Sequence, residues 1–311
     1  MIMRAFYDEF LDAKMKALDF ASFMLEIISH DHSAAIVNVA LLYLNGVLAL
    51  NDSTLKFGVN PIVSFLSKDL RHQVLADAFN HCYIRLALDD KNKDIQRALL
   101  DGLISYATGL ENVNLLKRWL TGEDKFLANK LPLSLEKKWK ILMKVYTHES
   151  INHEDKEALL NQLYAEDKTE LKNKYKLIIK AMNSNDTERH LLMNDYFSVD
   201  STLSFTETKI SLLGFNHSTV PESSLQLSYD RFYKEFPEIV DKKNIAFSKT
   251  IFFGMIPDSD DIETVIMKTK EMMSRIKDDH YHIKKLITNA IESMEQVKAS
   301  RELVGHDLTR K

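Results

Sequence analysis

Glycine and proline are scarce in this sequence. Eight Gly and five Pro occur in 311 residues, well below the average usage of about 7% and 5%. A sheet protein needs turn-forming residues every 8 to 12 residues or so, and these two types supply most of them. The scarcity therefore argues against a β-sheet fold and favours helices joined by short polar connections.

Cysteine is almost absent as well. The single Cys82 excludes an internal disulfide framework and fits a reducing compartment, so we expect a cytoplasmic protein. Its surroundings, "AFNHCYIRLAL", have the composition of a buried helix. The sequence therefore predicts a packed thiol rather than a nucleophile.

Long apolar runs and blocks of one charge are also missing. The best apolar stretch, residues 34–50, is broken by Asn38, Asn45 and Gly46, short of the roughly 18 apolar residues that a membrane span needs. The formal net charge is −4 and no basic block stands out, which argues against a nucleic-acid binder. The first residues are amphipathic with no leader pattern, so we expect a chain cut from something longer, without a membrane partner.

Apolar residues recur at helical spacing throughout the chain. Ser134 is a plausible N-cap for a helix whose apolar stripe continues at i, i+3, i+4 and i+7, and the same pattern returns in three later segments. The four stripes consist of Trp139, Leu142, Met143 and Tyr146; Leu171, Tyr175, Ile178, Ile179 and Met182; Ile262, Val265, Ile266, Thr269, Met273 and Ile276; and Ile283, Leu286, Ile287, Ala290, Ile291 and Met294.

Short polar clusters interrupt the helical pattern, roughly every 15 to 20 residues between 134 and 255. Consecutive short antiparallel helices of this kind are typical of an α-solenoid, in which each hairpin buries its apolar face against the next. We predict an all-α superhelix of HEAT-like hairpins forming a single domain over 1–311. A softer division is possible near 121–134, and the closing helices span about 260–304.

Histidine pairs give no convincing metal site. In "THESINHED", His148 and His153 are five residues apart, about 140° around a helix, whereas the zinc-peptidase motif H-E-x-x-H needs a spacing of four. We interpret this segment as a solvated connection after a helix that ends near Tyr146. His280 and His282 are two apart, about 200° around a helix, and cannot share an ion there; we interpret them as part of a helix start rich in acidic residues. His30 and His32 are also two apart, in a predicted loop, and we weigh metal binding there in the same way.

Other catalytic motifs are absent from the sequence. It has no G-x-S-x-G elbow, no glycine-rich phosphate loop and no C-x-x-C pair, so we predict no catalytic or metal residues and no cofactor in this chain. Arginines beside aromatic residues could hold an anionic group of a peptide, because Arg binds a carboxylate bidentately. We name Arg85 in "HCYIRLAL" and Arg118 in "NLLKRWLTGE" as candidate peptide-binding residues, with a surface or ion-pair role as the alternative.

The order of segments resembles the helical C-terminal domain of the aminopeptidase N family of zinc metallopeptidases. The likeness starts at "FYDEFLDAKMKALDFASFMLEIISHDHSAAIV", continues through "IQRALLDGLISYATGLENVNLLKRWLTGE", and closes with "FYKEFPEIVDKKNIAFSKTIFFGMIPDSDDIETV" and "IKKLITNAIESMEQVKASREL". It rests on segment order and helix character. The family's H-E-x-x-H site and G-A-M-E-N loop do not occur here.

The resemblance implies an accessory domain that is not catalytic by itself. In the family, this domain packs against the catalytic module, roofs the substrate cavity and can help to bind the peptide. Its expected partners are therefore the catalytic module of the same polypeptide, which would carry the zinc, and peptide substrates. The alternative hypothesis is a free-standing helical-repeat adaptor that binds a protein segment through its concave surface.

Overall fold

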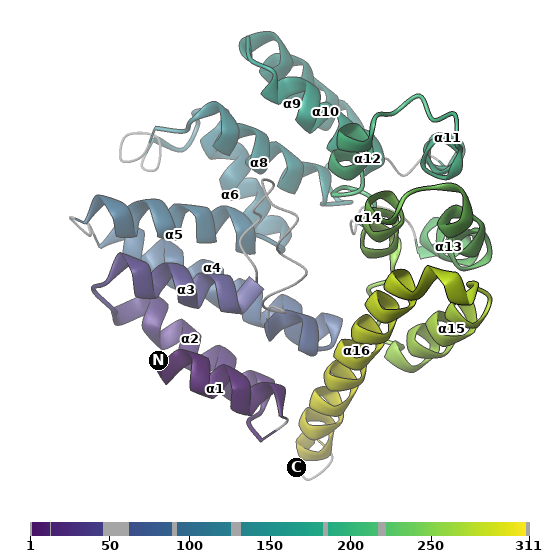
Figure 1. Cartoon of the computed structure of the whole chain (residues 1–311). Coiled ribbons are helices and arrows are strands. Elements are labelled where there is room, and N and C mark those ends of the chain that lie inside the picture. Colours follow the sequence, from purple (N-terminus) through teal and green to yellow (C-terminus); the bar gives the residue numbers. More distant parts are fainter. Residues whose placement is uncertain are drawn as a thin grey trace. The chain divides into compact units, whose positions relative to one another are not determined.

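A computed structural model describes residues 2–12, 14–45, 62–88, 92–125, 132–182, 186–216 and 222–308. Within these ranges the chain forms fifteen α-helices and two short 3₁₀ helices, and no strand (Figure 1). The predicted all-α class is therefore confirmed.

The chain divides into two compact units. Unit 1 comprises Met1–Leu116 and Ser293–Lys311, and unit 2 comprises Lys117–Glu292. The sequence predicted a single repeat domain with a softer division near 121–134. The division falls slightly earlier along the chain, and the last residues of the chain belong to unit 1.

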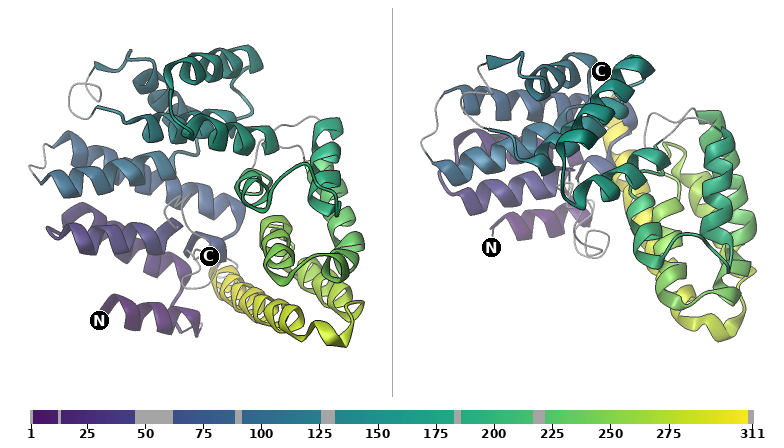
Figure 2. Two further views of the ribbon diagram at one scale, coloured as in Figure 1. Left: turned by 45° about the horizontal axis from the view of Figure 1, so that its top comes forward. Right: turned by 90° about the horizontal axis from the view of Figure 1, so that it is seen from above.

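Unit 1 is a stack of helix hairpins. The α2 and α3 helices pack on each other, as do α4 and α5, and the hairpins stack because α2 contacts α4 and α3 contacts α5. The purple-to-blue helices in Figures 1 and 2 show this arrangement. The elements of this part of the chain are α1 (Ile2–Leu11), α2 (Ala17–His30), α3 (Ala34–Asn45), η2 (Ile62–Phe65), α4 (Lys68–Ala87), α5 (Lys93–Tyr106) and α6 (Leu110–Leu120), which runs into unit 2.

Aromatic side chains form the core of the first hairpins in unit 1. Phe10 stacks on Phe20 with ring centroids 5.6 Å apart, and meets Phe65 edge to face at 4.6 Å. The Tyr106 hydroxyl donates a hydrogen bond of 2.9 Å to the Leu41 carbonyl, which ties α5 to α3. Such ring pairs contribute about 0.5–1.5 kcal/mol each beyond the area they bury.

Unit 2 consists of helices in two layers. One layer runs α8, α10, α12, α14, and in the other α13 lies between α11 and α15, because helices two apart in the chain contact each other. This succession is the packing rule of a helical solenoid, as predicted. The elements are α8 (Leu135–Tyr146), α9 (His153–Glu166), α10 (Leu171–Ala181), α11 (Asp186–Phe197), α12 (Phe205–Ser211), α13 (Glu222–Lys242), α14 (Ile245–Met255), α15 (Ile262–Ser274), η3 (Asp278–His280) and α16 (Tyr281–Leu308), which ends in unit 1.

A buried polar network holds the α9–α10 turn against α8. The Trp139 indole N–H donates to Asp167 Oδ2 at 2.7 Å, and the backbone N–H and hydroxyl of Thr169 both donate to Asp167 Oδ1 at 2.7 Å. Burial opposes ionisation of this carboxyl, but the hydrogen bonds from Thr169 and Trp139 outweigh it and lower the pKa of Asp167 below its ordinary value. Trp139 also stacks on Tyr175, with ring centroids 5.4 Å apart.

The polar clusters in the sequence coincide with helix ends. Asn92, Ser134, Asn152 and Asn244 each cap a helix by accepting a backbone N–H with the side-chain oxygen. Ser204 forms a capping box with Glu207. These short side chains satisfy N–H groups that have no partner within the helix, which is why the predicted connections end where they do.

The closing helices also agree with the periodicity. The stripe beginning at Ile262 forms α15, and the stripe beginning at Ile283 lies in α16. Near the end of α16, Arg301 Nη2 donates to the Ser64 carbonyl at 3.2 Å, a contact within unit 1. Among the described residues, no helix combines the length and the apolar composition that a bilayer crossing requires.

Candidate functional site

The two arginines predicted to bind peptide lie in different units and different environments. Arg85, on α4 of unit 1, is buried, and its guanidinium donates to the Ile28 carbonyl at 2.5 Å and the Asp31 carbonyl at 2.6 Å. These are carbonyls of the last turn and C-cap of α2, groups that need partners outside their own helix. Arg85 therefore anchors the end of α2, and a role in peptide binding stays a prediction.

Arg118 is the opposite case. It lies near the C-terminal end of α6 with an exposed side chain, while its backbone carbonyl accepts the N–H groups of Glu123 and Asp124 at 2.8 and 3.0 Å. Its role as a peptide contact also stays a prediction.

Two of the histidine pairs lie where the sequence placed them, whereas His30 is the last residue of α2 and only His32 lies in the connection that follows. The α8 helix ends at Tyr146 and α9 begins at His153, so "THESINHED" is a connection between helices, as predicted. His148 Nδ1 accepts the Ser150 backbone N–H at 3.3 Å, and burial lowers the pKa of His148. His280 Nε2 lies 2.8 Å from Asp241 Oδ1. Across the described ranges, no three His, Cys, Asp or Glu side chains gather in a way that could hold a metal ion.

Cys82 matches its prediction. Its side chain is fully buried on α4. Burial raises the pKa of the thiol far above the ordinary range. A thiol held in its protonated form in the core is a poor nucleophile.

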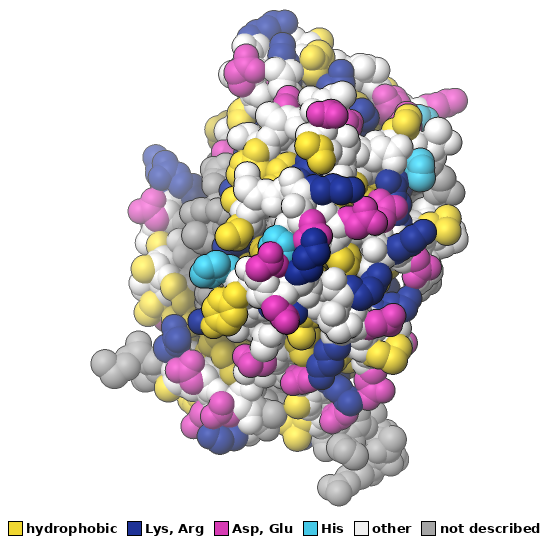
Figure 3. Space-filling view, turned by 45° about the vertical axis from the view of Figure 1, so that its right-hand side comes forward, with side chains coloured by type: hydrophobic (Ala, Val, Ile, Leu, Met, Phe, Trp, Pro, Cys, Tyr) yellow, Lys and Arg dark blue, Asp and Glu magenta, His cyan; other side chains and the backbone are white. Residues whose placement is uncertain are grey.

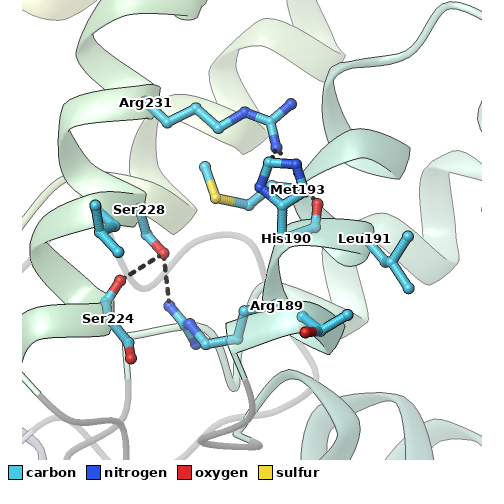
Figure 4. A pocket seen from close by; sticks show the side chains of 9 residues that line it. Arg189, His190, Leu191, Met193, Ser224, Ser228 and Arg231 are labelled. Carbon is cyan, nitrogen blue, oxygen red and sulfur yellow. Dashed lines mark hydrogen bonds between the residues drawn. The ribbon is translucent and has the colours of Figure 1, made fainter.

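A cavity between α11 and α13 is a candidate site in the described part of the chain. It encloses about 370 Å³, which falls at the lower end of the range for small-ligand sites. Both helices belong to unit 2 and pack on each other. Figure 4 shows the site from close by. The lining residues are Thr187, Arg189, His190, Leu191, Met193, Ser224, Leu227, Ser228 and Arg231.

Arg189 forms the floor of this α11–α13 cavity. It is 3% exposed, and its Nη1 donates to the Ala181 carbonyl at 3.2 Å and the Phe215 carbonyl at 3.1 Å. Its Nη2 donates to Ser228 Oγ at 3.4 Å, and the guanidinium lies 4.2 Å from the centroid of the Phe215 ring. Arg189 thus links the end of α10 and the turn after α12 to α13. It also gives the floor of the cavity a positive charge.

Arg231 and His190 form the rim. Arg231 Nη1 donates to the His190 carbonyl at 3.3 Å and lies 3.4 Å from His190 Nδ1 (Figure 4). Arg231 Nε donates to Glu235 Oε1 at 2.9 Å, one turn further along α13. The guanidinium is also within 5.3 Å of the centroid of the Phe197 ring. These contacts fix the orientation of the guanidinium while its Nη2 has no hydrogen-bond partner among the described residues.

Apolar side chains flank the rim on both helices. Leu191 on α11 is 59% exposed and Leu227 on α13 is 66% exposed. Met193 is buried and lines the same cavity. These exposed leucines on two adjacent helices add apolar area beside a cavity that combines apolar walls with a few polar groups, as small-ligand and peptide sites do.

Sequence reasoning missed this site for a clear reason. The α13 segment "YDRFYKEF" is rich in aromatic residues, and Phe232, Tyr233 and Phe236 are buried in the core. The four α13 residues of the site, Ser224, Leu227, Ser228 and Arg231, do lie at i, i+3, i+4 and i+7, one face of a helix. That spacing was a usable signal, but only the packing of α11 against α13 shows that the face borders a cavity.

Charges of both signs cover the surface around unit 2. On the face drawn in Figure 3, Lys and Arg side chains are interspersed with Asp and Glu side chains. Within the described part of the chain, the residues that line the α11–α13 cavity depart from this mixture, since they include two Arg and one His and no carboxylate. The cavity is therefore suited to an anionic group.

Comparison with known proteins adds no relationship. No protein-family model matches the chain, and no curated protein matches its sequence. The resemblance to the aminopeptidase N family stays a prediction from the sequence.

Proposed function

We propose that the chain is a helical-repeat protein that binds an extended peptide segment and catalyses no reaction by itself. The observation that carries the proposal is the α11–α13 cavity with its exposed leucines. Stacked helices offer extended surfaces on which a segment can be held by dispersed contacts. Exposed Leu191 and Leu227 supply apolar contact area, and the cationic rim supplies orientation.

A photo-crosslinking experiment tests the binding site. We expect N-acetylated, C-amidated peptides that carry a benzophenone side chain to crosslink to α11 and α13, as mapped by mass spectrometry. Truncation of Leu227 to Ala should weaken binding about 5- to 20-fold, because a leucine buried on binding contributes about 1–2 kcal/mol of transfer free energy. Leu88→Ala is the matched control, since Leu88 is 78% exposed and lies in unit 1 as the C-cap residue that follows α4. Crosslinks spread evenly over both units, or equal effects of the two truncations, would contradict the proposal.

The accessory role in a zinc aminopeptidase is the narrower form of this proposal. It adds that the peptide is the substrate of a catalytic module, which would be the partner and would supply the zinc. The adaptor hypothesis shares the peptide-binding surface and differs in having no such module. Binding to a separately produced catalytic module of the family would favour the accessory role.

Activity measurements test the inert character of the chain. We expect the purified chain to hydrolyse no aminoacyl fluorogenic substrate with zinc added and to retain no stoichiometric zinc, because His148 and His153 lie on a connection and at a helix start instead of one helix face. Turnover with one zinc per chain that His148→Ala abolishes would overturn this expectation. Turnover that survives the substitution would point to another site or to a contaminant.

A further inference from the structure

The rim of the α11–α13 cavity offers a cation in a fixed orientation. Arg231 has two of its three nitrogen atoms engaged, Nε with Glu235 and Nη1 with His190. A guanidinium carries five N–H donors, and both donors of Nη2 remain for a ligand. Its side chain is only 19% exposed, so the orientation is held by packing before any ligand arrives. A pre-oriented donor loses little freedom on binding.

The charges near this donor favour an anion, with one opposing group. Arg189 lies in the floor and His190 at the rim, and the described residues that line the cavity include no carboxylate. Glu235 is the opposing group, since its carboxylate contacts the Nε edge of Arg231 at a distance of 2.9 Å. It neutralises part of the charge while leaving the Nη2 side open. The exposed Glu188 on α11 does not line the cavity.

The spacing of Leu227 and Arg231 sets the spacing of the ligand groups. The two residues are four apart on α13, so they are separated by about 6 Å along the helix axis. In an extended peptide, side chains two residues apart point to the same side and are about 6.6–7 Å apart. An apolar side chain resting on Leu227 and Leu191 therefore places the side chain two residues away at Arg231.

We propose that the α11–α13 cavity selects peptide segments in which an acidic residue, Asp or Glu, lies two positions from a large apolar residue. This inference rests on the proposed peptide binding and names the class of segment bound. The carboxylate accepts hydrogen bonds from Arg231 Nη2, and the apolar side chain covers the two leucines. Charge-assisted hydrogen bonds of this kind are about twice as strong as neutral ones.

Fluorescence anisotropy with paired peptides tests the selection. The probe is a short labelled, N-acetylated and C-amidated peptide with Leu and Glu two positions apart, compared in both chain directions with the same peptide carrying Gln in place of Glu. We expect the Glu peptide to bind about tenfold more tightly, and the difference to shrink as salt is raised. Capped termini ensure that the measured carboxylate belongs to the side chain.

Variants of the full chain assign the effect to Arg231. Arg231→Gln should weaken the Glu peptide about tenfold and the Gln peptide less than about twofold. Lys234→Gln removes the same charge from an exposed position of α13 and should change neither affinity by more than about twofold. Glu235→Gln removes the competing carboxylate and should tighten the Glu peptide by about two- to fivefold.

The possible outcomes separate the two proposals. Binding of both peptides with equal affinity, or equal effects of Arg231→Gln on both, would overturn the acidic selection and leave peptide binding intact. Binding of neither peptide and of no crosslinking peptide would overturn peptide binding at this surface, and the selection with it. Circular dichroism of each variant checks that the fold is retained.

Discussion

We expect the Gly214→Ala variant to lose about 3 kcal/mol or more of unfolding free energy. This loss is larger than the one expected for the same substitution at Gly254 or Gly109. A Cβ at Gly214 would lie 2.2 Å from the Ile178 carbonyl oxygen and 3.0 Å from Met182 Cγ. The first neighbour is backbone of α10, so a rotamer change cannot relieve the clash. The α10 helix and the turn after α12, which contains Gly214, would have to separate, and overpacking of that kind typically costs about 1–3 kcal/mol or more.

Two other glycines provide graded controls for this prediction. A Cβ at Gly254 would lie 2.8 Å from Leu212 Cβ and 3.0 Å from its two Cδ atoms, of which only the Cδ atoms can move by a rotamer change, and a Cβ at Gly109 would meet nothing within 4 Å. We expect Gly254→Ala to fall between the other two and Gly109→Ala to stay within about 0.5 kcal/mol of the parent. Urea unfolding followed by circular dichroism compares all three. Trp119 and Trp139 are both buried in unit 2, so their fluorescence reads the unit that contains Gly214. A Gly214→Ala variant as stable as Gly109→Ala would contradict the prediction.

The helices of this chain could be predicted because their causes are local. The stripe from Trp139 to Tyr146 and the cap at Ser134 lie within a few residues of each other, and both are present in α8. Burial of Cys82 followed in the same way from its immediate neighbours. Periodicity and capping involve only i to i+4 relationships, which a single sequence displays directly.

Contacts between helices could not be predicted, for the complementary reason. Gly214 gives no sign in the sequence that the backbone of α10 passes against it. At the α11–α13 cavity, a hydrogen bond joins Arg189 on α11 to Ser228 on α13. The sequence between these residues has no repeat that would predict which helices pack together. The division after Leu116 likewise depends on which helices contact each other, while the sequence suggested only a softer division near 121–134.

For Arg85, the sequence indicated a negatively charged partner, and the structure shows hydrogen bonds to backbone carbonyl oxygens. The sequence placed a cation beside aromatic residues on a buried helix and suggested an anionic ligand. In the structure, the partners of its guanidinium include two backbone carbonyls at the end of α2. Carbonyl oxygens at a helix C-terminus carry the negative end of the helix dipole, so they attract a cation much as a carboxylate does. Residue type predicted the sign of the partner but not its identity.

Replacement of Arg85 by Met should therefore destabilise unit 1 by about 2–4 kcal/mol, because the Ile28 and Asp31 carbonyls lose charge-assisted hydrogen bonds in a largely buried site. The single thiol gives a selective readout. Cys82 is fully buried on the same helix, so its labelling rate by a thiol reagent rises as α4 opens. We expect faster labelling in Arg85→Met and little change in Arg97→Met, whose side chain is 71% exposed and pairs with Asp94 on the surface.

Arg85→Lys distinguishes the structural role from the peptide-binding one. Lysine keeps the charge but has no planar fork that can reach two carbonyls at once, so labelling of Cys82 should still accelerate in this variant. If Arg85 instead acted as a cation for a peptide carboxylate, Lys would retain much of the peptide affinity and the thiol would stay protected. Unchanged Cys82 labelling in both Arg85 variants would show that the end of α2 does not depend on this side chain. The two separate hydrogen bonds from Nη1 to Ile28 and from Nη2 to Asp31 favour the first outcome, since they use the planar fork of Arg that Lys lacks.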